Sequence, residues 1–198
     1  MVSVIKSVSC YACGVCSARR LRHKSLEWQI VMPFNPQTIS DTPLVFATVG
    51  LPARGKSYLA RRLLRYLSWL GYQTKIFNVG AYRRALLGGA HQHDFFSPDN
   101  QEGLVLRERM ASTALEDLKN WIREGGEVAI YDATNSSRSR RRLIRDEAAQ
   151  VGARVVFLES ITDDPEVIEK NIEDKRLHSP DYIGQSEDRA SQDFRLRM

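Results

Sequence analysis

Cysteine is scarce in this 198-residue chain, and its three cysteines all lie near the N-terminus, at Cys10, Cys13 and Cys16. Residues 17–198 therefore cannot carry a disulfide framework, which excludes the class of small secreted domains stabilised by cross-links. A domain without thiols is typical of proteins from a reducing compartment. We accordingly expect a cytoplasmic protein.

Acidic residues are missing from the first 26 positions, where five basic residues stand without any opposite charge. These five account for the whole net charge of +5, because the remaining 24 Lys and Arg side chains balance 24 Asp and Glu side chains. Proteins that bind nucleic acid through its phosphates usually concentrate positive charge on the binding domain. The balanced domain offers no such footprint, so we predict no nucleic-acid partner.

Long apolar runs are missing as well, since no stretch approaches the roughly 20 residues that a membrane-spanning helix needs. We therefore predict no membrane partner. The hydrophobic fraction of 42% and the charged fraction of 27% are ordinary for a globular protein. The length is sufficient for one hydrophobic core, and we expect one folded domain with an appendage.

The appendage is the N-terminal segment, and we expect residues 1–42 to be a disordered leader in front of a domain at 43–198. Its apolar residues follow no regular period, and prolines interrupt it before the first strand. The spacing of the three cysteines resembles part of a metal-binding run, but only His23 could serve as a fourth ligand, so a metal-free leader is favoured. An organellar transit peptide is the alternative interpretation, because the segment contains arginine and no acid.

The most informative stretch reads L-V-F-A-T-V-G-L-P-A-R-G-K-S and occupies positions 44–57. Six β-favouring residues run into G-x-x-x-x-G-K-S, and an amphipathic helical pattern follows at once, which is the context that a phosphate-binding loop requires. Gly50 and Gly55 allow backbone N–H groups to converge on phosphate oxygens, and the helix N-terminus adds partial positive charge. Lys56 supplies a cation and Ser57 a hydroxyl for Mg²⁺. The stretch predicts binding of ATP with Mg²⁺.

Strands and helices alternate through the rest of the chain, which predicts an α/β fold, a parallel sheet of P-loop NTPase type flanked by helices. The expected strands are Leu44–Val49, Thr74–Asn78, Glu127–Asp132 and Arg154–Ser160. The first expected helix ends at Gly71 and carries Leu59, Leu63, Leu67 and Leu70. A long helix opened by Asp99 carries Leu104, Ala111, Leu115, Leu118 and Ile122. Three more helices are expected: one capped by Ser136 or Ser137, one beginning at Pro165, and a last one at Ser186–Met198. Between them we expect a loop at Gly88–Pro98, whose His91 and His93 are interpreted as surface residues rather than metal ligands.

Two charged residues fall at the expected ligand edge of this sheet. Asp132 ends an apolar strand, and the carboxyl ends of parallel strands meet at the edge where the phosphate loop lies. A magnesium-associated acid or a catalytic base is needed there. Arg140 differs from the other arginines of its helix, because it lies three and four residues before Leu143 and Ile144 and shares their core-facing side. Its guanidinium would suit a phosphate ester in the ligand crevice.

Several strings together resemble one family, the kinase half of 6-phosphofructo-2-kinase/fructose-2,6-bisphosphatase, from about Pro43 to the last residue. They are G-L-P-A-R-G-K-S-Y at 50–58, F-N-V-G-A-Y-R-R at 77–84, D-F-F at 94–96, Y-D-A-T-N at 131–135, E-S-I at 159–161, D-D-P at 163–165 and S-P-D-Y at 179–182.

The resemblance implies a phosphotransferase that moves the γ-phosphoryl group of ATP, with Mg²⁺, to the 2-hydroxyl of fructose 6-phosphate, giving fructose 2,6-bisphosphate, a regulator of glycolysis. Asp132 and Lys56 would be catalytic, and Ser57 and Asp132 would hold the metal. The nucleotide would contact Gly50, Leu51, Pro52, Ala53, Arg54, Gly55, Lys56, Ser57, Tyr58, Asn171, Lys175 and Arg176. The sugar phosphate would contact Arg83, Arg107, Thr134, Arg140 and Arg197.

Departures from the family pattern keep other interpretations open. Thr162 stands where animal members have a cysteine, and Arg176 stands where members have a nucleotide-contacting lysine, which keeps the charge but not the geometry. The resemblance also implies that the chain stops before the last strand of the family's sheet, which would leave the 154–160 strand as an unprotected edge. The alternatives are a P-loop kinase for another small metabolite and a non-catalytic ATP-binding module. A homodimer is the assembly we would test first.

Overall fold

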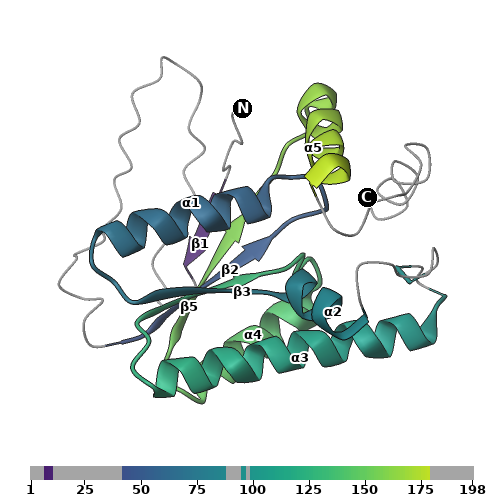
Figure 1. Cartoon of the computed structure of the whole chain (residues 1–198). Helices are drawn as coiled ribbons and strands as arrows, with labels where there is room; N and C mark the ends of the chain where they lie inside the picture. Colours follow the sequence, from purple (N-terminus) through teal and green to yellow (C-terminus); the bar gives the residue numbers. More distant parts are fainter. Residues whose placement is uncertain (1–6, 11–41, 88–94, 97–98, 179–198) are drawn as a thin grey trace.

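A computed structural model describes residues 7–10, 42–87, 95–96 and 99–178 of the chain (Figure 1). The strands are β1 (Ser7–Cys10), β2 (Leu44–Val49), β3 (Thr74–Asn78), β4 (Val128–Asp132) and β5 (Arg154–Glu159), and the helices are α1 (Lys56–Trp69), α2 (Val79–Leu87), α3 (Gln101–Arg123), α4 (Arg138–Ala149) and α5 (Pro165–His178).

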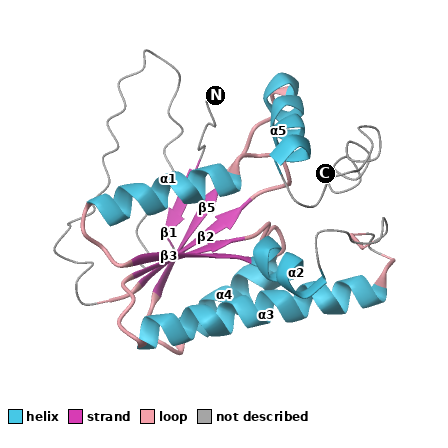
Figure 2. Ribbon diagram, in the orientation of Figure 1, coloured by secondary structure: helices cyan, strands magenta, loops and turns pink. Residues whose placement is uncertain are grey.

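The sheet has the order β1-β5-β2-β4-β3, and its four strands from the domain run parallel to one another. Strand β2 lies at its centre with all six residues buried, which is the pattern of a parallel strand covered on both faces. Helix α1 covers one face, and α3 and α4 cover the other (Figure 2). The predicted α/β P-loop architecture is therefore confirmed.

Alternation along β2 divides the core into two layers. Val45, Ala47 and Val49 pack on the side of α3 and α4, whereas Leu44 and Phe46 pack on the side of α1. Within the predicted helical stripes, Leu70 and Leu104 prove to be 47% and 38% exposed and so lie outside this core. The regular spacing of apolar residues therefore extends beyond the part of each helix that packs on the sheet.

Local hydrogen bonds explain where the helices begin. The Ser137 hydroxyl accepts from the Arg140 N–H at 3.2 Å and starts α4, and the Asp164 carboxylate accepts from the Glu166 N–H at 3.0 Å beside Pro165. Helix α3 is capped by Asn100, which accepts from the Gly103 N–H at 2.7 Å. The sequence had indicated Asp99 as its first residue, so the cap lies one position later.

Two further elements differ from the prediction. Helix α2 begins directly after β3, although its sequence carries Gly80 and no clear apolar period. Strand β1 lies in the segment where no secondary structure was expected, and it pairs antiparallel with β5. The predicted unprotected edge at β5 is thus wrong, because residues 156–159 of that edge pair with β1. The domain boundary at residue 43 stays a prediction, and the helix expected at Ser186–Met198 lies outside the described residues.

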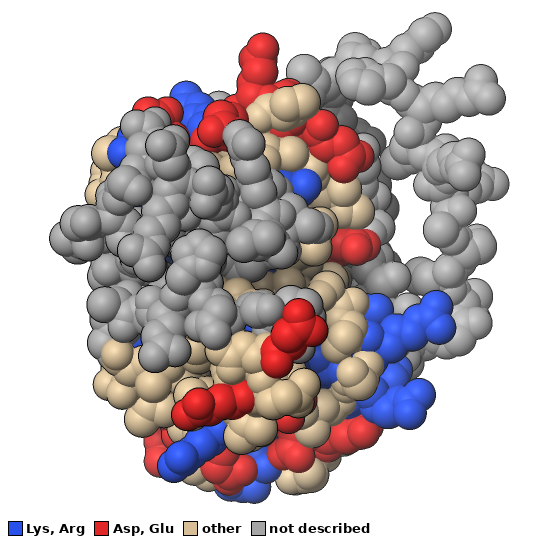
Figure 3. Space-filling view, turned by 90° about the vertical axis from the view of Figure 1, so that its right-hand side faces the viewer, with Lys and Arg blue, Asp and Glu red and all other residues tan. Residues whose placement is uncertain are grey.

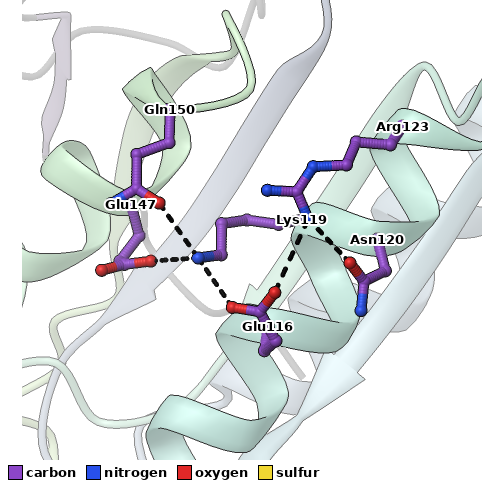
Figure 4. A network of polar contacts seen from close by, with 6 residues as sticks. All are labelled: Glu116, Lys119, Asn120, Arg123, Glu147 and Gln150. Atoms are coloured by element: carbon purple, nitrogen blue, oxygen red, sulfur yellow. Dashed lines mark hydrogen bonds and ion pairs between the residues drawn. The ribbon is translucent and has the colours of Figure 1, made fainter.

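A buried lysine joins α3 to α4 on the side of the sheet away from α1 (Figure 4). Lys119 Nζ lies 2.5 Å from Glu147 Oε2, 3.1 Å from Gln150 Oε1 and 2.7 Å from Glu116 Oε2. Hydrogen bonds to Glu116 and Glu147 raise the pKa of Lys119 and keep it charged. None of the helices in the described ranges has both the length and the apolar character needed to cross a bilayer.

Candidate active site

The loop between β2 and α1 has the backbone of a phosphate cradle. Gly50 and Gly55 have φ values of 136° and 81°, and Ala53 shares the left-handed region at 57°. A Cβ added to Gly50 would lie 2.5 Å from the Ser160 carbonyl oxygen, so no other residue fits that position. Gly55 caps α1 without a side-chain hydrogen bond, which leaves the first N–H groups of the helix for an anion.

Lys56 is buried at the start of α1, and its ammonium group donates to the Leu51 carbonyl at 2.6 Å. Burial, with smaller contributions from the charges of Lys175 and Arg54, lowers the pKa of Lys56 from 10.5 to about 8, while Asp132 acts in the opposite direction. A negative ligand beside this amine would restore its positive charge.

Asp132 ends β4 next to the loop and is 3% exposed. Its Oδ1 lies 3.2 Å from the Thr48 hydroxyl, and its Oδ2 accepts from the Asn78 amide at 2.6 Å. A carboxylate has about four acceptor positions, so the two bonds leave capacity for a metal or a substrate hydroxyl. Ser57 and Asp132 therefore suit Mg²⁺, which usually takes one or two protein ligands and completes its shell with phosphate oxygens and water.

Asn78 is a residue of this site that sequence reasoning missed. It is the register partner of Asp132 on the neighbouring strand, and its Oδ1 accepts from the Ala81 N–H at 2.8 Å in the first turn of α2. One side chain thus fixes both the carboxylate and the helix that carries Arg83. An asparagine at the end of a strand, two residues before a glycine, is a weak capping signal, and only the strand order reveals its second bond.

Two arginines predicted to bind the sugar phosphate come together around one aromatic ring. The guanidinium carbons of Arg83 and Arg107 lie 5.3 Å and 6.0 Å from the centre of the Phe96 ring, and Arg107 also donates to the Phe95 carbonyl at 2.9 Å. Burial lowers the pKa of Arg107, although Glu108 opposes the effect. Arg83 lies on α2, Arg107 on α3 and Phe96 in the segment between them, so tertiary packing brings these residues together.

The segment after β4 carries Thr134 and Arg140. The Thr134 carbonyl accepts from the Gly50 N–H at 3.0 Å, which ties this segment to the start of the phosphate loop, and its side chain is exposed. Arg140 is half-buried in the first turn of α4, and its charge opposes the rise that burial causes in the pKa of Tyr131. Both residues therefore lie at the same sheet edge as Asp132.

Helix α5 borders the phosphate loop from the other side. The Asn171 amide donates to the Ala53 carbonyl at 2.8 Å, and the charge of Lys175 reaches Lys56. Arg176 is half-buried on the same helix, whereas Tyr58 is 39% exposed on α1 with the Arg62 guanidinium over its ring. Arg197, His91 and His93 lie outside the described residues.

Figure 3 views the molecule from the side where the parallel strands end. Lys and Arg side chains gather at the lower right of this view, on the side of α4, and Asp and Glu side chains are scattered over the remaining surface. Helix α4 carries five arginines, at positions 138, 140, 141, 142 and 145. Arg141 donates to the carbonyls of Asn135 and Ser136, so it supports the segment that carries Thr134. The edge as a whole suits anionic ligands.

Comparisons with known proteins agree with this arrangement. A family model described as 6-phosphofructo-2-kinase matches residues 34–198. The chain is 45% identical to 6-phosphofructo-2-kinase/fructose-2,6-bisphosphatase 4 of Rattus norvegicus over 81% of its own length, and 44% identical to 6-phosphofructo-2-kinase/fructose-2,6-bisphosphatase of Aquarana catesbeiana over 80%. It spans about a third of the length of these relatives, 34% in both cases.

Among solved structures, the Pnkp1/Rnl/Hen1 complex contains a chain with a TM-score of 0.51 and 22% identity, covering 65% of this chain and 39% of that one. At this level of identity the likeness concerns the fold alone. It is consistent with the α/β architecture described above.

Proposed function

The chain belongs to the 6-phosphofructo-2-kinase family, and from this premise we propose that it transfers the γ-phosphoryl group of ATP to the 2-hydroxyl of fructose 6-phosphate. The product would be fructose 2,6-bisphosphate. The proposal is supported by the phosphate loop, by the buried Asp132 at the end of the neighbouring strand β4, and by the arginine pair around Phe96. A kinase for a phosphorylated sugar needs these three parts.

The nucleotide would lie over the loop from Gly50 to Ser57, with its terminal phosphates beside Lys56. Phosphoryl transfer depends mainly on position and on stabilising charge, because the transferred group carries negative charge on its oxygens. The Lys56 ammonium would offset part of this charge in a site where burial strengthens the interaction. Mg²⁺, when bound, would supply further positive charge, and Ser57 and Asp132 are the groups that would hold it.

Asp132 would orient the acceptor hydroxyl and take its proton as the phosphoryl group is transferred. Asn78 holds one carboxylate oxygen, and the Thr48 hydroxyl, which also lies 2.9 Å from the Ala133 carbonyl, lies beside the other, so little rearrangement would be needed at that step. Thr134 would bond the sugar from the segment after β4. Arg83, Arg107 and Arg140 would bind the 6-phosphate, for which the planar guanidinium fork is well suited.

Calorimetric titration tests this assignment and separates it from simple nucleotide binding. The chain should bind ATP with Mg²⁺, and the complex should then bind fructose 6-phosphate. Asp132→Asn keeps the shape of the side chain and should retain ATP binding while product formation falls at least a hundredfold. A chain that binds ATP and ignores fructose 6-phosphate would be a nucleotide-binding module, and a chain that phosphorylates only other sugars would be a kinase for another metabolite.

A further inference from the structure

Side chains hold the carbonyl groups of the phosphate loop. Four consecutive carbonyls each accept a hydrogen bond from a side chain: Leu51 from Lys56, Pro52 from Arg54, Ala53 from Asn171 and Arg54 from Ser160. The first two donors, Lys56 and Arg54, lie within the phosphate-binding sequence at 50–57. The last two come from outside the loop, and they hold it from two different elements.

The two outside donors are firmly placed. Ser160 follows β5 and is 1% exposed, and its own N–H donates to the Val49 carbonyl at 2.8 Å, just before the loop begins. Asn171 lies on the face of α5 that also carries Ile168 and Ile172, and this face packs on Ala53. Burial of Ser160 and the packing of the α5 face that carries Asn171 limit the positions that these two donors can take.

Peptide geometry gives these two bonds a consequence. In a trans peptide the C=O and the following N–H point in opposite directions. The carbonyl of Ala53 shares its peptide plane with the N–H of Arg54, and the carbonyl of Arg54 shares its plane with the N–H of Gly55. The Ala53 carbonyl is held toward Asn171 of α5, so the N–H of Arg54 points away from α5. The Arg54 carbonyl is held toward Ser160 after β5, so the N–H of Gly55 points away from Ser160.

We infer that Ser160 and Asn171 are positioning residues that aim the N–H groups of Arg54 and Gly55 at the phosphates of the nucleotide. The inference rests on the proposed function, because it takes a nucleoside triphosphate as the ligand. In this role Asn171 affects nucleotide binding by orienting the loop backbone. Ser160, for which the sequence indicated no role, acts in the same way. Fixed donors lose little freedom when phosphate binds, so the arrangement favours tight binding of the phosphate chain.

A merely structural role would make a different prediction from a positioning role. If the two bonds only stabilised the fold, removing one would lower the melting temperature and weaken every ligand alike. If they orient the N–H groups, the loss should fall on ligands that carry phosphates and spare those that lack them. Adenosine shares the base and ribose of ATP without its phosphates, and the two compounds therefore form the decisive pair of probes.

The test is calorimetric titration of the full chain and its variants with ATP in the presence of Mg²⁺, and separately with adenosine. Ser160→Ala and Asn171→Ala should each weaken ATP binding about tenfold, the effect expected for losing one oriented hydrogen bond, and leave adenosine binding unchanged. Ser160→Thr keeps the hydroxyl and should recover most of the ATP affinity. Thr162→Ala removes a hydroxyl two residues further along, which is 3.4 Å from the Asp164 nitrogen, and should change neither ligand.

Asn171 is only half-buried, so its variant keeps the test informative if Ser160→Ala fails to fold. Unchanged ATP affinity in the folded variants, or an equal loss for ATP and adenosine, would overturn the inference and leave the proposed kinase intact. If the parent chain itself bound no ATP, both the proposed function and this inference would be rejected.

Discussion

At the residue scale, Lys56 offers the most direct prediction, because its pKa is lowered to about 8 in the folded chain. Phosphate beside the ammonium group should raise that pKa again, so the amine should take up a proton when ATP binds above pH 8. We expect uptake close to one proton at pH 9 and little at pH 7, and ATP affinity should fall as pH rises through 8. Calorimetry in two buffers with different ionisation enthalpies measures the uptake.

Lys56→Arg is the matched control for this prediction, since a guanidinium stays charged throughout the range. The variant should show no proton uptake at pH 9. Uptake of the same size in this variant, or none in the parent chain, would contradict the assignment. Stability should also follow the shift: the cost of burying the charged amine is fully present below pH 8 and disappears as pH rises toward 10.5.

Arg140 provides a second test at this scale. Replacing Arg140 with alanine removes a charged donor from the edge that carries Asp132, and KM for fructose 6-phosphate should rise about tenfold to a hundredfold while KM for ATP stays constant. Arg142→Ala is the comparison, because Arg142 is an exposed arginine of the same helix. Steady-state kinetics of both variants test this prediction. An equal rise in KM for fructose 6-phosphate in the two variants would mean that the loss of any positive charge on α4 weakens binding, and that Arg140 makes no specific contact.

The residues of this site show which features the sequence could reveal. Gly50, Lys56 and Asp132 were predictable, because a local motif or the end of an apolar strand identifies each of them. Asn78 and Thr48 were not predictable, because their bonds to Asp132 depend on which strands are neighbours. The grouping of Arg83 and Arg107 around Phe96 likewise requires the packing of α2 against α3.

At the element scale, the contact between α3 and α4 depends on the buried Lys119. Lys119→Met keeps the length of the side chain but removes its bonds to Glu147 and Gln150, and it leaves Glu147 without its partner. We expect a loss of about 2 kcal/mol in the free energy of unfolding. This is less than for a fully buried ion pair, because the carboxylates of Glu116 and Glu147 both retain some contact with water. Urea denaturation monitored by circular dichroism measures this loss.

Arg123→Ala is the control, because this exposed arginine also pairs with Glu116, at 3.6 Å, yet should cost no more than about 0.5 kcal/mol. Equal losses of unfolding free energy in the two variants would show that the buried Lys119 contacts stabilise the fold no more than the exposed Arg123 pair does. Since the pKa of Lys119 is raised, its contribution should be complete below the ordinary lysine pKa and should fade only as pH rises through the raised value.

Elements were predictable where local signals agreed with one another. The strands β2 and β3 match their predicted bounds, because β-favouring residues are limited on both sides by turn residues. Helix α2 was missed because Gly80 and neighbouring arginines obscure its apolar period, and its start depends on a bond from the Ala81 N–H to the Asn78 side chain. The start of α3 was misplaced by one residue because Asp99 and Asn100 are both good caps, and the Asn100 side chain is the one that accepts from the Gly103 N–H as the N-cap.

At the scale of the whole molecule, the strand order explains why the candidate site lies where it does. Strand β2 stands between β5 and β4, so the phosphate loop has Ser160 on one side and Asp132 on the other. Alternation of strands and helices predicted this parallel arrangement, but no pattern in the first 42 residues predicted that β1 would pair with β5. The chain covers only about a third of its relatives, and its assembly as a homodimer and its location in the cytoplasm remain predictions.

The central claim is transfer of phosphate from ATP to the 2-hydroxyl of fructose 6-phosphate, and phosphorus NMR of the reaction mixture tests it most directly. With the parent chain, ATP, Mg²⁺ and fructose 6-phosphate, we predict a new phosphate resonance on carbon 2 of the sugar, growing as ADP accumulates. The same mixture with Asp132→Asn should remain unchanged over the same time. Release of inorganic phosphate without a sugar 2-phosphate, or a product phosphorylated at another position, would contradict the account.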